Sequence, residues 1–364
     1  MVAVEQPARL VSLDAFRGLT IAFMVLVNNP GSWRFVYWPL EHAPWHGWTP
    51  TDLVFPFFLF IVGTALHFSR RTSAGAAVRR AAALFGLGLF LNGYPFFHLA
   101  TWRIPGVLQR IAVCYLAAWA VRRLVGPTGQ ALVAAGLLAL DWALMTQVGL
   151  PGGQPPNLEP GANFAAHVDR LFLRGHMWSV TRTWDPEGLV STLPAIATTL
   201  LGCLAGAWLR GPAAPVRKAI GLLGAGLVLL AAGVAWGVSF PVNKALWTSS
   251  FVLLTGGLAA AGLGLCYFVA DVAGLQRWTR PWTTYGRNAI AVFVGSGLLA
   301  KTLALIRWPG PAGQPLSLQA RLHAWLFASW LPPFPASAAY ALASVGLWYL
   351  VALALDRRGL YLKV

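Results

Sequence analysis

The chain has 364 residues, of which 57% are hydrophobic and 10% are charged, and its mean hydropathy is +0.62. This composition excludes an ordinary soluble globular domain. The formal net charge of +16 sits in short loops between apolar segments, so we attribute it to membrane topology and expect no nucleic-acid partner.

Apolar segments of about 20 residues, the length that crosses about 30 Å of hydrocarbon, recur along the chain. They predict an all-α fold, a polytopic integral membrane helical bundle of about ten helices (nine to eleven), in a single domain over 1–364. We find no internal repeat. The predicted spans are 12–30, 52–69, 80–97, 104–122, 130–149, 188–209, 218–238, 246–270, 285–306 and 337–355.

Basic residues gather at alternate ends of these spans, which predicts cytoplasmic termini and a multi-pass protein of the inner membrane, in contact with lipid. The cluster consists of Arg9, Arg17, Arg70, Arg71, Arg79, Arg80, Arg122, Arg123, Arg210, Arg217, Lys218, Arg277, Arg280, Arg287, Arg357, Arg358 and Lys363. The main outward segments then lie near 31–51, 150–187 and 307–336. Irregular backbone is concentrated there, so we expect the site to open on that side.

The first span carries three polar residues, Asp14, Arg17 and Asn28, within about 60° of one another on one helix face. An ion pair plus an interhelical amide would explain this stripe. A polar wall along a route through the membrane would explain it equally well. Residue spacing does not separate the two interpretations.

The hinge 41–52 between the first two spans holds His42 and His46, two of only seven histidines. A base that titrates near neutral pH at a bilayer surface suggests chemistry. Asp52 follows Thr49, and it either caps the next helix or orients a histidine.

The fourth span contains Gln109 and Arg110 about two turns from its start. A buried arginine is costly unless it meets an anion or a carboxylate. The carboxylates that we consider as its partner are Asp52, Asp141, Asp185 and Glu187.

Several later positions are also candidates. Asp185 and Glu187 lead into the sixth span, where they either cap the helix or bind a cationic or hydroxylated acceptor. Asn243 and Lys244 occupy the next outward turn. Arg287 and Asn288 open the ninth span from inside. Cys114, Cys203 and Cys266 show no ligand spacing, so we expect no metal and no disulfide.

Six motifs follow one another along the chain. They are SLDAFRG (12–18) with VN (27–28), HAPWHGWT (42–49), DLVFP (52–56), RIPGVLQR (103–110), DPEG (185–188) and PVNKALW (241–247). Together they resemble the heparan-α-glucosaminide N-acetyltransferase family, part of the wider transmembrane acyltransferase group. The likeness runs from Arg9 to Val364.

The resemblance implies an acyltransferase that moves an acetyl group from cytosolic acetyl-CoA to an amino sugar across the membrane. It assigns the catalytic histidine to His42 and a functional asparagine to Asn28, and because animal relatives dimerise it leaves a homodimer open. The chain departs from the animal enzymes at His46, where they have an asparagine, and its 150–187 segment is shorter. We expect a bacterial-type member without their large lumenal N-terminal domain. The acceptor is left open among an envelope glycan, a lipid-linked sugar and an imported amino sugar, as is N- or O-acetylation.

These inferences combine into one mechanistic hypothesis. His42 acts as general base or as acyl carrier, Asn28 steadies the oxyanion or orients the imidazole, and Asp52 orients His42 or His46. Residues expected to bind acetyl-CoA are Asp14, Arg17, Gln109, Arg110, Arg287 and Asn288. Residues expected to bind the acceptor are Trp45, His46, Asp185, Glu187, Asn243 and Lys244. The rival hypothesis is a transporter or flippase of a sugar or lipid-linked sugar.

Overall fold

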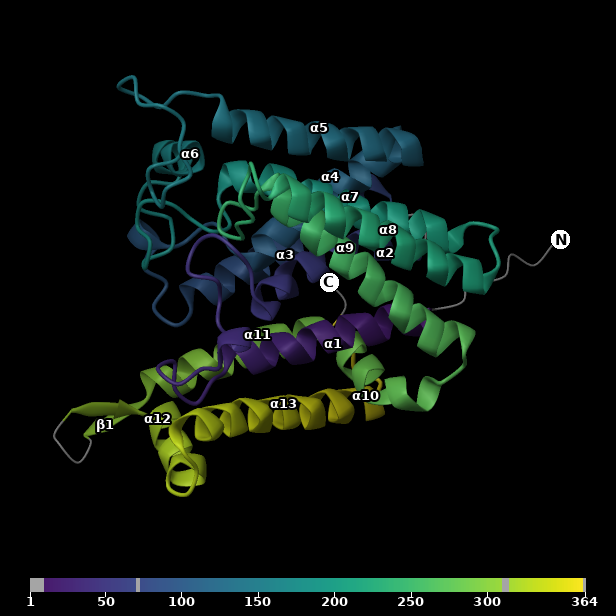
Figure 1. Cartoon of the computed structure of the whole chain (residues 1–364). Helices are drawn as coiled ribbons and strands as arrows, with labels where there is room; N and C mark the ends of the chain where they lie inside the picture. Colours follow the sequence, from purple (N-terminus) through teal and green to yellow (C-terminus); the bar gives the residue numbers. More distant parts are fainter. Residues whose placement is uncertain (1–9, 70–72, 310–313, 363–364) are drawn as a thin grey trace.

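The structure is a computed structural model that describes residues 10–69, 73–309 and 314–362, and it is almost entirely helical (Figure 1). The α-helices are α1 (Val11–Asn28), α2 (Val54–Leu66), α3 (Ala74–Gly93), α4 (Val107–Leu124), α5 (Pro127–Thr146), α6 (Phe164–Phe172), α7 (Leu189–Arg210), α8 (Pro215–Trp236), α9 (Ser249–Tyr267), α10 (Gln276–Arg287), α11 (Ala289–Leu305), α12 (Leu318–His323) and α13 (Pro333–Arg357). The short elements are the 3₁₀ turns η1 (Trp38–Leu40), η2 (Pro50–Leu53) and η3 (Leu99–Thr101), the π turns η4 (Phe268–Val272) and η5 (Ala324–Ala328), and an antiparallel hairpin of β1 (Arg307–Pro309) with β2 (Pro315–Ser317).

The predicted all-α membrane fold is confirmed. Seven described helices are long and apolar enough to cross a membrane, namely α1, α3, α5, α7, α8, α9 with η4, and α13. The count of ten spans and the orientation of the termini stay predictions. One reason is that α2 has only 13 residues, because its predicted span starts as the turn η2. Another is that α4 includes three arginines, Arg110, Arg122 and Arg123.

The predicted ninth span, 285–306, differs from the structure at its inner end. The chain bends by 65° between α10 and α11, and an eighth span results only if the two helices are counted together. Asn288 lies at the bend, is 1% exposed, and donates its side-chain amide to the carbonyls of Thr284 and Ala352 at 3.3 Å. The amide thus ties the bend to α13, because a carbonyl freed by a break needs a new donor in an apolar setting.

Glycines bring the central helices into backbone contact. A Cβ added at Gly18 on α1 would lie 1.7 Å from the carbonyl oxygen of Trp282 on α10, and one at Gly286 would lie 2.0 Å from that of Asp14. Helices α2 and α7 cross in the same way, with Gly63 against the carbonyl of Thr199 at 1.9 Å. Small residues permit this approach, which is a main source of helix association in a bilayer.

The three predicted outward segments meet at one end of the bundle. In Figure 1 the helices run side by side between α5 and α13 at the two edges, and the long connections gather at the left of the view. The indole N–H of Trp45 donates to the carbonyl of Leu158 at 2.9 Å, and Phe35 packs on Phe334 with ring centroids 5.6 Å apart. We call this the loop end. Of the basic cluster, Arg9, Arg70, Arg71 and Lys363 lie outside the described residues.

Candidate functional site

His42 and Asp52 form a pair at the loop end. The Nδ1 atom of His42 lies 2.7 Å from Oδ1 of Asp52. The other carboxylate oxygen accepts the backbone amides of Thr49 at 3.0 Å and Ala43 at 3.1 Å. The Asp52 side chain is 1% exposed whereas that of His42 is 53% exposed. Asp52 therefore fulfils both roles considered from sequence, since it closes the capping box of η2 and holds the imidazole.

Lys244 completes this cluster from the turn between α8 and α9. Its Nζ lies 3.5 Å from Oδ1 of Asp52 and 3.0 and 3.2 Å from Nδ1 and Nε2 of His42. A carboxylate favours the tautomer in which Nδ1 carries the proton, and an ammonium group only donates. The lone pair of Nε2 is therefore the His42 acceptor available to Lys244.

Charge and burial set the protonation of this cluster. Burial acts to raise the pKa of Asp52, but the His42 hydrogen bond, the Lys244 charge and the Ala43 amide outweigh it, and the pKa falls below its usual value. Burial lowers the pKa of Lys244, and the nearby Asp52 and Glu187 charges oppose that shift only in part. The result is an ionised carboxylate beside an ammonium group whose proton is easier to lose than usual.

The turn that presents Lys244 is held by its own side chains. Asn243 accepts the amide of Leu246 at 2.9 Å, and its backbone amide donates to the hydroxyl of Thr248 at 3.0 Å. Trp247 has a φ of +56°, a left-handed conformation that costs a bulky residue about 1–2 kcal/mol. The side-chain amide of Asn243 also contacts Nδ1 of His46 at 3.3 Å. The 42–49 and 241–247 motifs are thus docked on each other.

The long segment 150–187 forms a wall beside this cluster. Trp45 donates its indole N–H to the carbonyl of Leu158 at 2.9 Å and packs edge to face on Trp184 with ring centroids 5.2 Å apart. The structure therefore brings together four residues predicted to bind the acceptor, Trp45, His46, Asn243 and Lys244, around His42.

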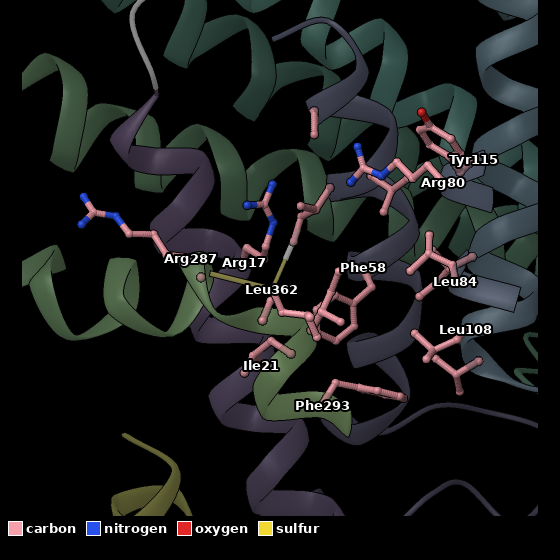
Figure 2. A pocket seen from close by; sticks show the side chains of 18 of the residues that line it. Arg17, Ile21, Phe58, Arg80, Leu84, Leu108, Tyr115, Arg287, Phe293 and Leu362 are labelled. Atoms are coloured by element: carbon pink, nitrogen blue, oxygen red, sulfur yellow. The ribbon is translucent and has the colours of Figure 1, made fainter. Parts of the chain in front are cut away.

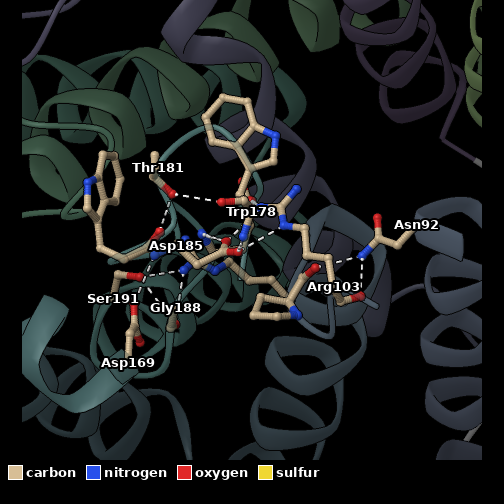
Figure 3. Close-up of polar contacts among 12 residues, drawn as sticks. Asn92, Arg103, Asp169, Trp178, Thr181, Asp185, Gly188 and Ser191 are labelled. Carbon is tan, nitrogen blue, oxygen red and sulfur yellow. Dashed lines mark hydrogen bonds and ion pairs between the residues drawn. The ribbon is translucent and has the colours of Figure 1, made fainter. Parts of the chain in front are cut away.

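The remaining two residues predicted to bind the acceptor, Asp185 and Glu187, form ion pairs with Arg103. The sequence alone did not single out Arg103. Arg103 makes a two-point contact with Asp185, at 2.8 Å from Nε and 2.6 Å from Nη2 (Figure 3). It also bonds Glu187. These acids raise the pKa of Arg103 although burial acts to lower it. Asp169 on α6 accepts the amides of Asp185 at 3.1 Å and Leu189 at 3.0 Å.

Of the two interpretations considered for Arg110, the structure does not bear out pairing with a carboxylate. None of the four carboxylates named from sequence forms an ion pair with it. Arg110 instead donates to the hydroxyl of Ser191 at 2.5 Å and to the carbonyl of Gly188 at 3.2 Å, and its guanidinium lies 5.1 Å from the ring centroid of Trp247. Asp185 and Glu187 are unavailable because Arg103, closer to the loop end, already binds them.

A cavity of about 400 Å³, here called the inner cavity, opens among α1, α2, α3, α4 and α11. Arg17, Arg80 and Arg287 lie along its border, and Figure 2 shows the first two on one side with Ile21 and Phe293 on the other. Of the residues predicted to bind acetyl-CoA, Arg17 and Arg287 line it. Asp14 pairs with Arg17 at 3.1 Å without lining it, and Asn288 and Arg110 do not line it.

A second cavity of about 330 Å³, here called the outer chamber, lies toward the loop end. It shares three lining residues, Val107, Leu108 and Phe293, with the inner cavity, so the two adjoin. Its polar lining residues include Asn28, Asn29, Asn92, Arg103, Gln109, Ser296 and Lys301. The side-chain nitrogen of Gln109 is buried and has no hydrogen-bond partner within the described part of the chain.

The structure separates two residues that the resemblance assigns to catalysis. Asn28 lines the outer chamber, whereas His42 lies in the surface cluster and lines neither cavity. Arg103 connects the two places, because it lines the chamber and binds Glu187, whose charge acts on Lys244. A reaction that uses both Asn28 and His42 needs substrates that reach from the outer chamber to the surface cluster.

These features define a class of protein, a helical integral membrane protein with two adjoining cavities and an aspartate–histidine pair in its loops. Comparison with known proteins identifies the family. Residues 9–221 match the family model described as "heparan-α-glucosaminide N-acetyltransferase, catalytic", and the chain belongs to this family. It is 29% identical over 360 residues to the heparan-α-glucosaminide N-acetyltransferase of Homo sapiens, covering 79% of this chain and 53% of that protein. The Mus musculus protein of the same name is also 29% identical over 360 residues, with 80% and 54% covered. The chain thus spans about half the length of these curated relatives.

Proposed function

We propose that this protein transfers an acetyl group from cytosolic acetyl-CoA to the amine or hydroxyl of an amino sugar at the opposite face of the membrane. Membership of the N-acetyltransferase family supports the reaction type. The observation that carries the proposal is the pair of adjoining cavities, which extends from three arginines toward the loop end. In the same proposal the protein lies in the inner membrane. The basic ends of its spans face the cytoplasm and its loop end faces the opposite side.

On the donor side, Arg17, Arg80 and Arg287 suit the phosphates of coenzyme A, because guanidinium groups bind phosphate oxygens in pairs. The apolar walls beyond them, such as Ile21 and Phe293, suit the thin pantetheine arm. The arm would pass the shared residues Val107 and Leu108 and deliver the thioester to the outer chamber. There Asn28 and the unpaired amide of Gln109 can donate to its carbonyl oxygen.

The chemistry is an acyl transfer in which the acceptor nitrogen or oxygen bonds to the acetyl carbon and the carbon–sulfur bond breaks. Nε2 of His42 removes the acceptor's proton, which finally resides on the departing thiolate. Asp52 holds Nδ1–H and stabilises the charged imidazole. In the structure the ammonium group of Lys244 lies 3.2 Å from Nε2 of His42, so the acceptor must displace it. The charge of Glu187 then offers the displaced ammonium group an alternative partner.

A two-step route, with the acetyl group carried on Nε2 of His42, fits the same geometry. The two routes differ in the absence of acceptor. Direct transfer leaves no label on the protein after incubation with labelled acetyl-CoA and denaturation, whereas the two-step route leaves label that His42→Ala removes.

Proteoliposomes test the proposal as a whole. With labelled acetyl-CoA supplied only on the cytoplasmic face and glucosamine only on the other, labelled acetylglucosamine should accumulate on the acceptor side. No product in any arrangement of donor and acceptor would contradict the proposal.

The adjoining cavities also suit the rival function, transport of a sugar or a lipid-linked sugar. A transporter would move labelled glucosamine across the same proteoliposomes without acetyl-CoA. The acetyltransferase leaves free glucosamine on its original side.

A further inference from the structure

A third cavity, of about 280 Å³, lies among α11, α12, η5 and α13. It is lined mainly by apolar side chains. These include Leu299, Leu303, Leu322, Phe327, Leu347 and Trp348. Two of its lining residues, Leu326 and Leu347, are 41% and 48% exposed, so the cavity opens on the outer surface of the bundle. We call it the lipid-facing cavity.

The surface around this opening is apolar over a full helix length. Helix α13 is a candidate span with 17% of its span window buried, and Leu342 and Leu350 on it are 60% and 62% exposed. Trp325 in η5 and Trp330, two residues after η5, are 75% and 67% exposed, as is typical of the interfacial belt of a membrane protein. In a bilayer that α13 spans, this opening would face the hydrocarbon near the boundary at the loop end.

The lipid-facing cavity adjoins the outer chamber. Asn29 and Ala300 line both, and the next residue, Lys301, lines the chamber. An apolar space open to lipid thus borders a polar space that is lined by Asn28, Gln109 and Arg103.

Lys301 places a positive charge in the outer chamber, and it follows the shared residue Ala300 in the sequence. Its ammonium group donates to the carbonyls of Leu91 and Tyr94, and it forms no ion pair with a carboxylate in the described ranges. A cation at membrane depth is costly unless an anion accompanies it. An anionic group entering from the lipid side would supply that partner.

From this arrangement we propose that the acceptor is a lipid-linked amino sugar phosphate. Its hydrocarbon chain occupies the lipid-facing cavity, its phosphate meets Lys301, and its sugar lies in the outer chamber between Asn28 and the route to His42. The inference rests on the proposed acetyl transfer and names the acceptor class for that site. A free sugar or a soluble glycan has no hydrocarbon chain that would fill the apolar cavity. A second protein chain in that cavity would not account for Lys301.

A matched pair of acceptors tests the inference. Glucosaminyl phosphate and citronellyl glucosaminyl phosphate carry the same head group, and only the second carries a hydrocarbon chain. In detergent with acetyl-CoA, we expect kcat/KM for the citronellyl compound to exceed that for the soluble compound by roughly tenfold or more, because burial of its hydrocarbon chain favours binding. Equal values would overturn the inference while leaving acetyl transfer intact. If neither compound nor free glucosamine is acetylated, the proposed function itself fails.

Ala343→Phe tests the location of the chain. Ala343 lines the lipid-facing cavity and is exposed, so the added ring fills the cavity without displacing packed neighbours. We expect the preference for the citronellyl compound to fall roughly tenfold. The matched control is Leu342→Phe, on the next residue of α13 and outside the cavity. Equal preferences in both variants would place the chain elsewhere, and a change of oligomeric state in Ala343→Phe with the preference intact would assign the cavity to a second copy of the protein.

Lys301→Met tests the phosphate contact, since methionine keeps length and removes charge. The variant should lose activity on citronellyl glucosaminyl phosphate relative to neutral octyl glucosaminide, and Lys301→Arg should restore that ratio in part. An unchanged ratio in Lys301→Met would contradict the role given to Lys301.

Discussion

Asp52 is the residue on which the surface cluster depends, because it alone binds His42, Lys244 and the hinge backbone. Asp52→Asn keeps the shape but removes the charge and permits the wrong imidazole tautomer. We expect kcat for acetyl transfer to fall roughly 100-fold or more, the scale of general-base catalysis. Glu41→Gln makes the same chemical change on an exposed side chain of the same hinge and should retain the parental kcat. Equal rates in Asp52→Asn and the parent would remove Asp52 from the mechanism.

The lowered pKa of Asp52 also predicts how stability depends on pH. Between its folded-state pKa and the ordinary value of 3.8, the unfolded chain binds more protons, so stability rises with pH in that interval. The contribution of ionised Asp52 is complete above that value and is lost as pH falls through the folded-state pKa. The difference in thermal midpoint between the parent and Asp52→Asn should therefore be largest near neutral pH and shrink in acid. A difference that grows in acid would contradict this assignment.

Arg103 holds two acids, and one of them, Asp185, has a side chain that is fully buried. Arg103→Met would leave that carboxylate without its counter-ion and should reduce the free energy of unfolding. We expect a loss of up to about 3 kcal/mol, the lower end for a buried pair, because the Arg103 side chain is partly exposed. Arg174→Met, at an exposed arginine of the same segment, serves as control and should leave the midpoint unchanged. Equal midpoints for the two variants in a detergent melt would show that the Arg103 cluster does not stabilise the fold.

The sequence identified the motifs that form this site, but it did not identify which side chains within them bind each other. The 42–49 and 241–247 motifs were identified, and they dock on each other. The choice among carboxylates for Arg110 failed because Arg103 lies nearer to Asp185, a distance that depends on how α4 and α7 pack. Arg103 itself looked like a residue at the edge of a span, and no spacing rule marks such a residue as the centre of a cluster.

At the scale of elements, the crossing of α1 and α10 fixes one border of the inner cavity. Gly18 and Gly286 touch the facing backbones, and the neighbouring Arg17 and Arg287 line the cavity. Gly18→Val should push the helices apart and weaken acetyl-CoA binding, and overpacking of this kind typically costs about 1–3 kcal/mol.

Gly86→Val on α3 is the matched control, since a side chain at Gly86 meets nothing within 4 Å. Both variants place the same β-branched residue in a helix, so only the crossing differs. Calorimetric titration with acetyl-CoA would measure the effect. If the two variants bind equally, the crossing does not shape the cavity.

Helix positions were predictable because about 20 apolar residues in succession admit few alternatives in a bilayer. Helix ends and bends were less so. The bend between α10 and α11 lies at Asn288, two residues after Gly286, and a tertiary hydrogen bond from the Asn288 side chain to Ala352 on α13 helps to hold it. The start of α2 was displaced by the capping box of η2, which places Asp52 in a turn ahead of the helix.

At the scale of the whole molecule, topology follows from charge. If the basic loops are cytoplasmic, alkaline phosphatase inserted in the loop between α7 and α8 should be inactive, and the same insertion in the 150–187 segment should be active. Activity at the α7–α8 loop would reverse the orientation. It would also place donor and acceptor on the opposite sides from those proposed.

The central claim, that His42 serves acetyl transfer from acetyl-CoA, has one most direct measurement. Protein purified in detergent is given labelled acetyl-CoA and glucosamine, and the parent is compared with His42→Ala and with His98→Ala, at an exposed histidine of a different loop. The account predicts labelled product from the parent and from His98→Ala, and a loss of roughly 100-fold or more in His42→Ala. Turnover by His42→Ala at the parental rate would contradict it.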